Sequence, residues 1–276
     1  MTIKEITTSI EQLAPLSNAE DFDNVGLLVG NNTTTLTGVL VTLDTLEETV
    51  EEAIAKQCNL IVSFHPIIFE GLKKLNGNNY VERVVLKAIK NNIAIYATHT
   101  ALDNSNKGVS AKICEVLGLK NTAILIPKKT INSFSDEAAI QNIGMGMIGE
   151  FEAEMSETDF LTFVKKTMKT ACIRHSETLG KPIKKVAVLG GSGSFAIESA
   201  IALNADAYIS SDFKYHDFFK AEKQLLLADI GHYESEQFTK NLLVEYLTKK
   251  FTNFAPALPA GRIILSEKST NPIYYI

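Results

Sequence analysis

Residues 39–66 read VLVTLDTLEETVEEAIAKQCNLIVSFHP. Two short apolar runs in this stretch, Val39–Leu43 and Leu60–Phe64, are typical of strands buried inside an α/β sheet. The segment between them, Leu46–Lys56, is predicted to be a helix. The stretch therefore predicts a strand–helix–strand unit with parallel strands, and its crossover should be right-handed.

Elements of the same kinds surround this unit and return in the second half of the chain. An amphipathic helix at Ile3–Leu13 precedes it, and a helix at about Tyr80–Lys90 leads into a third strand, Ile93–Ala97. The second half has the same order of strands and helices: Val186–Leu189, Phe195–Leu203, Ala207–Ser210, Tyr215–Glu222 and Leu225–Ile230. The fold class is therefore α/β. An internal duplication would explain the repeat, although any α/β protein alternates strands and helices in this way.

The composition excludes several classes of protein. With 276 residues, 45% hydrophobic and 21% charged, the chain has enough apolar material for a large core. A net charge of −5 without a basic cluster argues against a nucleic-acid partner. No apolar stretch could span a bilayer, and the N-terminus lacks a secretory signal, so we expect a cytoplasmic protein. The three cysteines, Cys58, Cys114 and Cys172, are expected to be reduced core residues.

Three apolar runs each end in side chains that bind metals. His65 follows the first run, His99 follows the second, and His232 follows the third. Because α/β sheets bind ligands beyond the carboxyl ends of their strands, three of the five histidines stand where a site is expected. Imidazole with carboxylate suits Zn²⁺, Fe²⁺ or Mn²⁺. The pattern predicts a composite metal site, and purely structural histidines are the alternative.

Two acids stand four residues after two of these histidines. Asp103 follows His99, and Glu236 follows His232, so a helical turn would bring each pair to one side. Asp103 could instead cap the next helix. One carboxylate can bridge two ions about 3.5–4 Å apart, an arrangement that generates hydroxide near neutral pH.

Three other segments have two interpretations each, and a fourth is assigned from its pattern of apolar residues. Gly190–Ser194 is either an anion-binding turn or a tight strand-to-helix turn. In Ser210–His216, the polar residues could contact a substrate or begin a solvated helix. Pro127–Gln141 is either a connection between the halves or an exposed hairpin, and Ser235–Lys250 is expected to be a C-terminal helix.

Short motifs along nearly the whole chain resemble one family. The motifs are Asp23–Leu27, Phe64–Pro66, Phe69 with Gly71–Lys73, Thr98–Thr100 with Asp103, Gly190–Gly193, Lys214–His216 and Gly231–Glu236. Together they resemble the dinuclear-metal family named for Ngg-interacting factor three, often described as GTP cyclohydrolase 1 type 2 homologues. The resemblance implies two related α/β/α lobes with mixed sheets and a metal site in the cleft between them. The lobes would comprise residues 1–104 plus 237–276, and residues 105–236.

The resemblance also implies site residues. The metal ligands would be His65, Asp103, His232 and Glu236, with one or two divalent ions per chain and Glu236 as the bridge. His99 would be a nearby acid/base residue. Family members usually have a histidine where this chain has Phe64, which removes one ligand from one ion. Water, His99 or another side chain then fills the gap, or the second ion binds weakly.

The activity implied by the resemblance is hydrolysis of a nucleotide-like small molecule, with metal-activated water opening the ring of GTP. The members of the family also look like ring-shaped homohexamers, and this chain has the length of the compact form without an inserted domain. Two alternatives remain: a dinuclear phosphoesterase, and a non-catalytic, metal-binding, ring-shaped interaction or regulatory protein.

Overall fold

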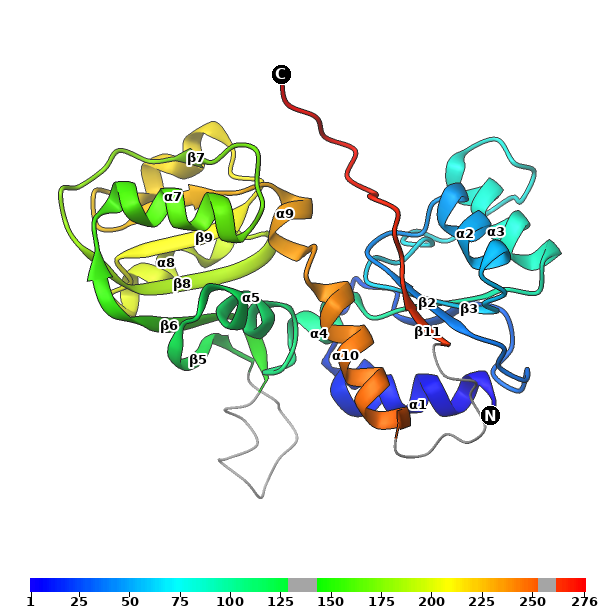
Figure 1. Ribbon diagram of the computed structural model, residues 1–276. Helices are drawn as coiled ribbons and strands as arrows, with labels where there is room; N and C mark the ends of the chain where they lie inside the picture. Colours follow the sequence, from blue (N-terminus) through cyan, green and yellow to red (C-terminus); the bar gives the residue numbers. More distant parts are fainter. Residues whose placement is uncertain (129–142, 253–261) are drawn as a thin grey trace. The chain divides into compact units, whose positions relative to one another are not determined.

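The structure, a computed structural model, describes residues 1–128, 143–252 and 262–276 (Figure 1). The chain divides into two compact units. The first comprises Met1–Leu102 and Thr239–Pro272, and the second comprises Asp103–Phe238 and Ile273–Ile276. The lobe boundaries expected from the sequence stay a prediction, because compactness alone does not define the ends of a duplicated lobe.

The first unit is built on a five-stranded mixed sheet. In the order in which they pair, its strands are β1 (Gly26–Val29), β4 (Ala94–Ala97), β3 (Leu60–Ser63), β2 (Val39–Thr42) and β11 (Ile263–Leu265). Only β1 runs antiparallel to its neighbour. Every residue of β2, β3 and β4 is buried, which explains why these strands are apolar throughout.

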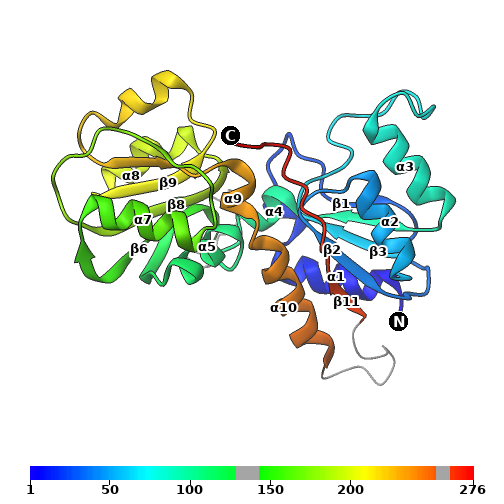
Figure 2. The ribbon, with the colours of Figure 1, turned by 45° about the horizontal axis from the view of Figure 1, so that its top comes forward.

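Helices cover both faces of this sheet. Two of them, α2 (Glu47–Ala55) and α3 (Tyr80–Lys90), pack together on one face (Figure 2). On the other face, α1 (Ile3–Leu13) packs against α10 (Thr239–Thr252). A short 3-10 helix, Leu16–Asn18, follows α1.

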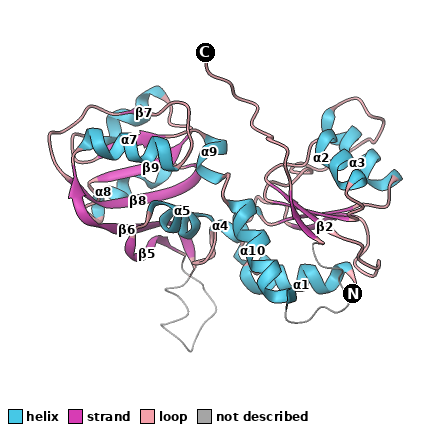
Figure 3. Ribbon diagram, viewed as in Figure 1, coloured by secondary structure: helices cyan, strands magenta, loops and turns pink. Residues whose placement is uncertain are grey.

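The second unit is built on a six-stranded mixed sheet. Its strands, in pairing order, are β5 (Lys120–Pro127), β6 (Gly144–Met155), β8 (Ile183–Ser192), β9 (Ala207–Ser211), β10 (Leu226–Asp229) and β7 (Arg174–His175). One face carries α5 (Val109–Leu117), α7 (Glu157–Thr167) and α9 (His232–Glu236). The other carries α8 (Ile197–Ala202; Figure 3). Two 3-10 helices, η2 (Ser194–Ala196) and η3 (Tyr215–Ala221), pack against α8. The helix α4 (His99–Asp103) links the two units.

The two sheets share a core pattern. Three parallel strands lie side by side in each, β2–β3–β4 in the first and β8–β9–β10 in the second. Val39 pairs with Leu60, and Val186 pairs with Ala207, at the same separation along the chain. In both sheets an antiparallel strand pairs with the third parallel strand: β1 pairs with β4, and β7 pairs with β10. The predicted α/β class with two mixed sheets is confirmed, and the matched register agrees with a duplication.

Some predicted elements differ in the structure. The predicted helix Tyr215–Glu222 is the 3-10 helix η3, which ends at Ala221, and the predicted helix Ser235–Lys250 is two helices, α9 and α10. Neither β5 nor β6 was expected, because three glycines interrupt the apolar pattern of β6. Of the stretch Pro127–Gln141, all but the first two residues lie outside the described part of the chain.

The cysteines follow the expectation in two cases out of three. Cys58 and Cys114 are buried free thiols, and burial raises the pKa of Cys114 to about 12. Cys172 is exposed, so its assignment to the core was wrong. It lies in the loop between α7 and β7, where the flanking apolar residues do not form a buried strand. Among the described residues, no helix is long and apolar enough to cross a membrane.

Candidate metal centre

His65 is held at the carboxyl end of β3 by main-chain and side-chain contacts. Its amide donates to the carbonyl of Leu43 at 2.9 Å, and its Nδ1 lies 2.7 Å from Asp44 Oδ1. The hydroxyl of Thr270 donates to the other oxygen of Asp44 at 2.5 Å. Phe64, one residue earlier, is fully buried, and its ring centroid is 4.9 Å from that of His65. The side chain at position 64 therefore packs against the histidine and offers no ligand.

His99 begins α4, directly after β4. Its Nδ1 lies 2.7 Å from Asp23 Oδ1, and the other Asp23 oxygen accepts from the amide and hydroxyl of Thr100. His99 has φ +26°, a backbone conformation that costs non-glycine residues about 1–2 kcal/mol. Such strained positions cluster at functional sites. His99 and His65 also lie close together, with 5.4 Å between ring centroids.

Asp23 is ionised in this setting. Burial is the largest effect and would raise its pKa, but the hydrogen bonds from His99 and Thr100 outweigh burial and lower the pKa to about 2. The side chain of Asp23 is fully buried. An ionised carboxylate only accepts hydrogen bonds, so the proton between Asp23 and His99 belongs to His99 Nδ1.

We expect Asp23→Asn to lower the free energy of unfolding by about 2 kcal/mol at neutral pH, since folding lowers the pKa of this carboxyl from 3.8 to about 2. Because the folded-state pKa is the lower one, the stabilisation is complete above the unfolded pKa, about 4, and disappears as the pH falls towards 2. Urea unfolding of both proteins at several pH values measures this. Asp21→Asn, an exposed neighbour, is the control. A difference that stays constant below about pH 4 would contradict the assignment.

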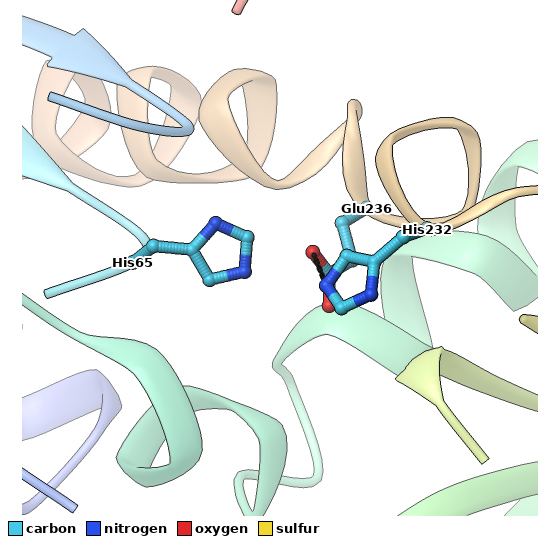
Figure 4. A group of neighbouring side chains, drawn as sticks. All are labelled: His65, His232 and Glu236. Carbon is cyan, nitrogen blue, oxygen red and sulfur yellow. Dashed lines mark ion pairs between the residues drawn. The ribbon is translucent and has the colours of Figure 1, made fainter. Parts of the chain in front are cut away.

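His232 and Glu236 lie one helical turn apart in α9, which follows β10. Their side chains point towards each other, with His232 Nε2 3.3 Å from Glu236 Oε2 (Figure 4). On its other side, His232 Nδ1 lies 2.7 Å from Asp212 Oδ2. Asp212 follows β9 and has φ +57°. The chain turns into α9 through Gly231, whose φ of +93° disfavours any other residue.

His232 is strongly biased towards its charged form. Burial is the largest effect and would lower its pKa, but the hydrogen bonds with Asp212 and Glu236 outweigh burial and raise the pKa to about 10. The proton on Nε2 stands between an imidazole and a buried carboxylate, which is 4% exposed. Surroundings that stabilise a cation at this point would also stabilise a metal ion bound to the same two groups.

The three strand-end histidines share one arrangement. His65, His99 and His232 each face an aspartate through Nδ1 at 2.7 Å. A carboxylate on one ring nitrogen fixes the tautomer and leaves Nε2 to bind a metal or carry a proton, as in carboxylate–histidine–metal triads. This donor chemistry fits a divalent ion of the zinc, iron or manganese type.

The glycine-rich turn at the end of β8 leaves room for the side chain of Glu236. The Gly191 amide donates to Ser235 Oγ at 2.9 Å, and the Gly193 amide donates to the carbonyl of Ser211. A Cβ at Gly191 would lie only 2.4 Å from Glu236 Oε1. Because these two amides already have partners, the tight-turn interpretation is favoured over the anion-binding one. The missing side chain makes room for the carboxylate.

Three of the four predicted ligands, His65, His232 and Glu236, could hold a metal ion (Figure 4). His65 comes from the end of β3, and the other two come from α9. Asp103 ends α4, is half-buried and is not in this group. The ligand roles of all four residues, and the role of His99 as an acid/base residue, stay predictions.

Three aspartates were missed as partners of the histidines. Asp44 and Asp212 come shortly after the ends of β2 and β9, the edge of the sheet where ligands are expected. That position was a signal for both. Asp23 stood in a motif but had no assigned role. Lys214 and His216, which could contact a substrate or begin a solvated helix after β9, are exposed.

Comparison with known proteins identifies the family. The model of the Duf34/NIF3 (NGG1p interacting factor 3) family matches residues 1–272. The chain belongs to this family. It is 33% identical over 283 residues to a Lactococcus lactis protein named GTP cyclohydrolase 1 type 2 homolog, with all of both chains covered. It also resembles the crystal structure of a Staphylococcus aureus protein, with a TM-score of 0.90, 30% identity, and 100% and 99% of the two chains covered.

Other members of the family are longer. A GTP cyclohydrolase 1 type 2 homolog of Staphylococcus epidermidis is 28% identical over an alignment of 370 residues that covers all of both chains. Because this chain has only 276 residues, that relative contains segments that are missing here.

Proposed function

We propose that this protein is a metal-dependent hydrolase of a nucleotide-like small molecule. The observation that supports it is the set of three histidines, each held by an aspartate through Nδ1. Together with Glu236, His65 and His232 could hold a metal ion. The name that the relatives carry, GTP cyclohydrolase 1 type 2 homolog, makes GTP the first substrate to test.

Under this proposal, some residues of the centre bind the ion and others position those ligands. His65, His232 and Glu236 would hold the ion, and Asp103 is proposed as a further ligand. When bound, a divalent ion lowers the pKa of water to near neutrality and polarises a substrate oxygen. Asp44 and Asp212 keep the two imidazoles in the tautomer that presents Nε2, and Gly191 leaves the space that Glu236 occupies.

His99 is suited to proton transfer. Asp23 fixes its orientation and tautomer, and its side chain is 20% exposed, so a substrate can reach the ring. At Nε2 it can take a proton from an attacking water molecule or give one to a leaving nitrogen. A positioned acid/base residue of this kind contributes roughly a hundredfold to ten-thousandfold in rate.

Incubation of the protein with GTP and Zn²⁺, Fe²⁺ or Mn²⁺, followed by chromatography, tests the proposal. We expect conversion of the guanine ring that requires the metal. His99→Gln should lower kcat at least a hundredfold and leave the metal content unchanged, because His99 is not assigned as a ligand. His175→Gln, an exposed histidine outside the centre, is the matched control.

Three results would each contradict one part of this proposal. Unchanged GTP with every one of these ions would remove the substrate assignment. Phosphate release with the base ring intact would instead indicate a phosphoesterase. Equal turnover by the His99→Gln and His175→Gln variants would remove His99 from the chemistry.

A further inference from the structure

Two exposed phenylalanines lie beside the histidines of the first unit. Phe22 is 68% exposed and Phe69 is 50% exposed, although large apolar rings are usually buried. Their ring centroids are 6.4 Å apart. The Phe69 ring is 6.1 Å from that of His99, nearly edge-on at 79°. The exposed aromatic surface is therefore continuous with an imidazole of the candidate centre.

Hydrogen bonds connect the loop that carries Phe22 to the start of α4 and to the loop that carries Phe69. Asp23, next to Phe22, accepts from His99 and from the amide of Thr100 at 3.0 Å. The side chain of Asn24 donates from Nδ2 to the carbonyl of Ile68, next to Phe69, at 2.6 Å. Phe22 and Phe69 are distant in the sequence. The hydrogen bond between Asn24 and Ile68 keeps their two loops together.

An aromatic surface of this kind suits one ligand chemistry. Flat heteroaromatic rings stack on phenylalanine side chains, and the interaction depends little on which base is present because every base has a π face. Anchored backbone on both loops reduces the entropy lost when a ligand orders the rings. A ring held there would lie beside His99, the residue assigned to proton transfer.

We propose that Phe22 and Phe69 form a stacking site for the nucleobase of the substrate. This inference rests on the proposed function, because it names the part of a nucleotide-like substrate that this surface binds. The inference does not assign a binding site to the phosphates or the sugar. The two rings therefore favour ligands that contain a base, whichever base it is, and take no part in the chemistry.

The test is binding of 2-aminopurine riboside triphosphate, whose fluorescence is quenched when the base stacks. The chain contains no tryptophan, so the probe fluoresces without interference from indole. Phe22→Ala and Phe69→Ala should each weaken binding about tenfold or more. Phe22→Tyr and Phe69→Tyr keep a ring and should bind like the wild type. Both alanine variants should remain folded, since each removes a side chain that is at least half exposed.

Two controls isolate the ring. Phe219→Ala removes another exposed phenylalanine, 62% exposed in η3 of the second unit, and should not change binding. Inorganic tripolyphosphate has no base, so its affinity should be equal in all variants. Absence of quenching with the wild type, equal probe binding by the alanine variants, or an equal loss of tripolyphosphate binding would each overturn the stacking site. A changed oligomeric state in the alanine variants, seen by light scattering, would also overturn it, because the rings would then bind another protein chain.

The stacking site and the hydrolase can fail separately. Metal-dependent conversion of GTP with the same KM in Phe22→Ala, Phe69→Ala and the wild type would overturn the stacking site and leave the function standing. Quenching that depends on both rings, without any turnover, would support the stacking site and remove the hydrolase.

Discussion

Glu236→Gln should reduce metal affinity about a hundredfold or more. Substitution of groups that only orient metal ligands already costs about tenfold to a hundredfold, and a proposed ligand should cost at least as much. The carboxylate of Glu236 is 4% exposed and faces His232 Nε2 at 3.3 Å. The amide of glutamine has nearly the same shape but carries no charge to hold the ion. Metal content after dialysis, measured by elemental analysis, gives the result directly.

Thermal stability gives a second measurement of Glu236→Gln. A ligand present at about a hundred times its dissociation constant stabilises the folded state by about 2.7 kcal/mol. Added Zn²⁺ or Mn²⁺ should therefore raise the Tm of the wild type and leave that of Glu236→Gln almost unchanged. Glu234→Gln removes the charge of another buried carboxylate in the same helix and is the matched control. Wild-type metal content in Glu236→Gln would remove Glu236 from the centre.

The strands that could be predicted are those buried on both faces. In β2, β3 and β4 no residue faces water, so an apolar run shows both where each strand lies and where it ends. The opposite holds for β6, which has exposed glutamates near one end and glycines within it. Such a strand forms because β5 and β8 pair with it on both sides, and that information is not local.

The same distinction applies to the candidate centre. His65, His99 and His232 could be identified because each follows a buried strand at the edge where ligands bind. Their aspartate partners could not be assigned, because a carboxylate in a loop has many uses and Asp23 lies 76 residues away from His99. Asp44 and Asp212 are also brought to their histidines by the pairing of neighbouring parallel strands.

Gly191→Ala should weaken metal binding by about tenfold to a hundredfold without changing any proposed ligand. The new methyl group would lie 2.4 Å from Glu236 Oε1 and 3.5 Å from His232 Cε1. Because the nearest atom is the end of a side chain, Glu236 can rotate away more easily than the backbone can move. The carboxylate would then leave the position in which it faces His232. Titration with Zn²⁺ or Mn²⁺ measures the loss.

A second glycine separates this steric effect from backbone strain. Gly191 has φ +72°, so alanine there also costs about 1–2 kcal/mol of folding free energy. Gly118 has φ +76°, and a Cβ at that position would meet no atom within 4 Å. Gly118→Ala should therefore show a similar loss of stability with wild-type metal affinity. If both variants lose metal equally, strain alone explains the effect. If Gly191→Ala keeps full affinity, the glycine-rich turn does not position Glu236.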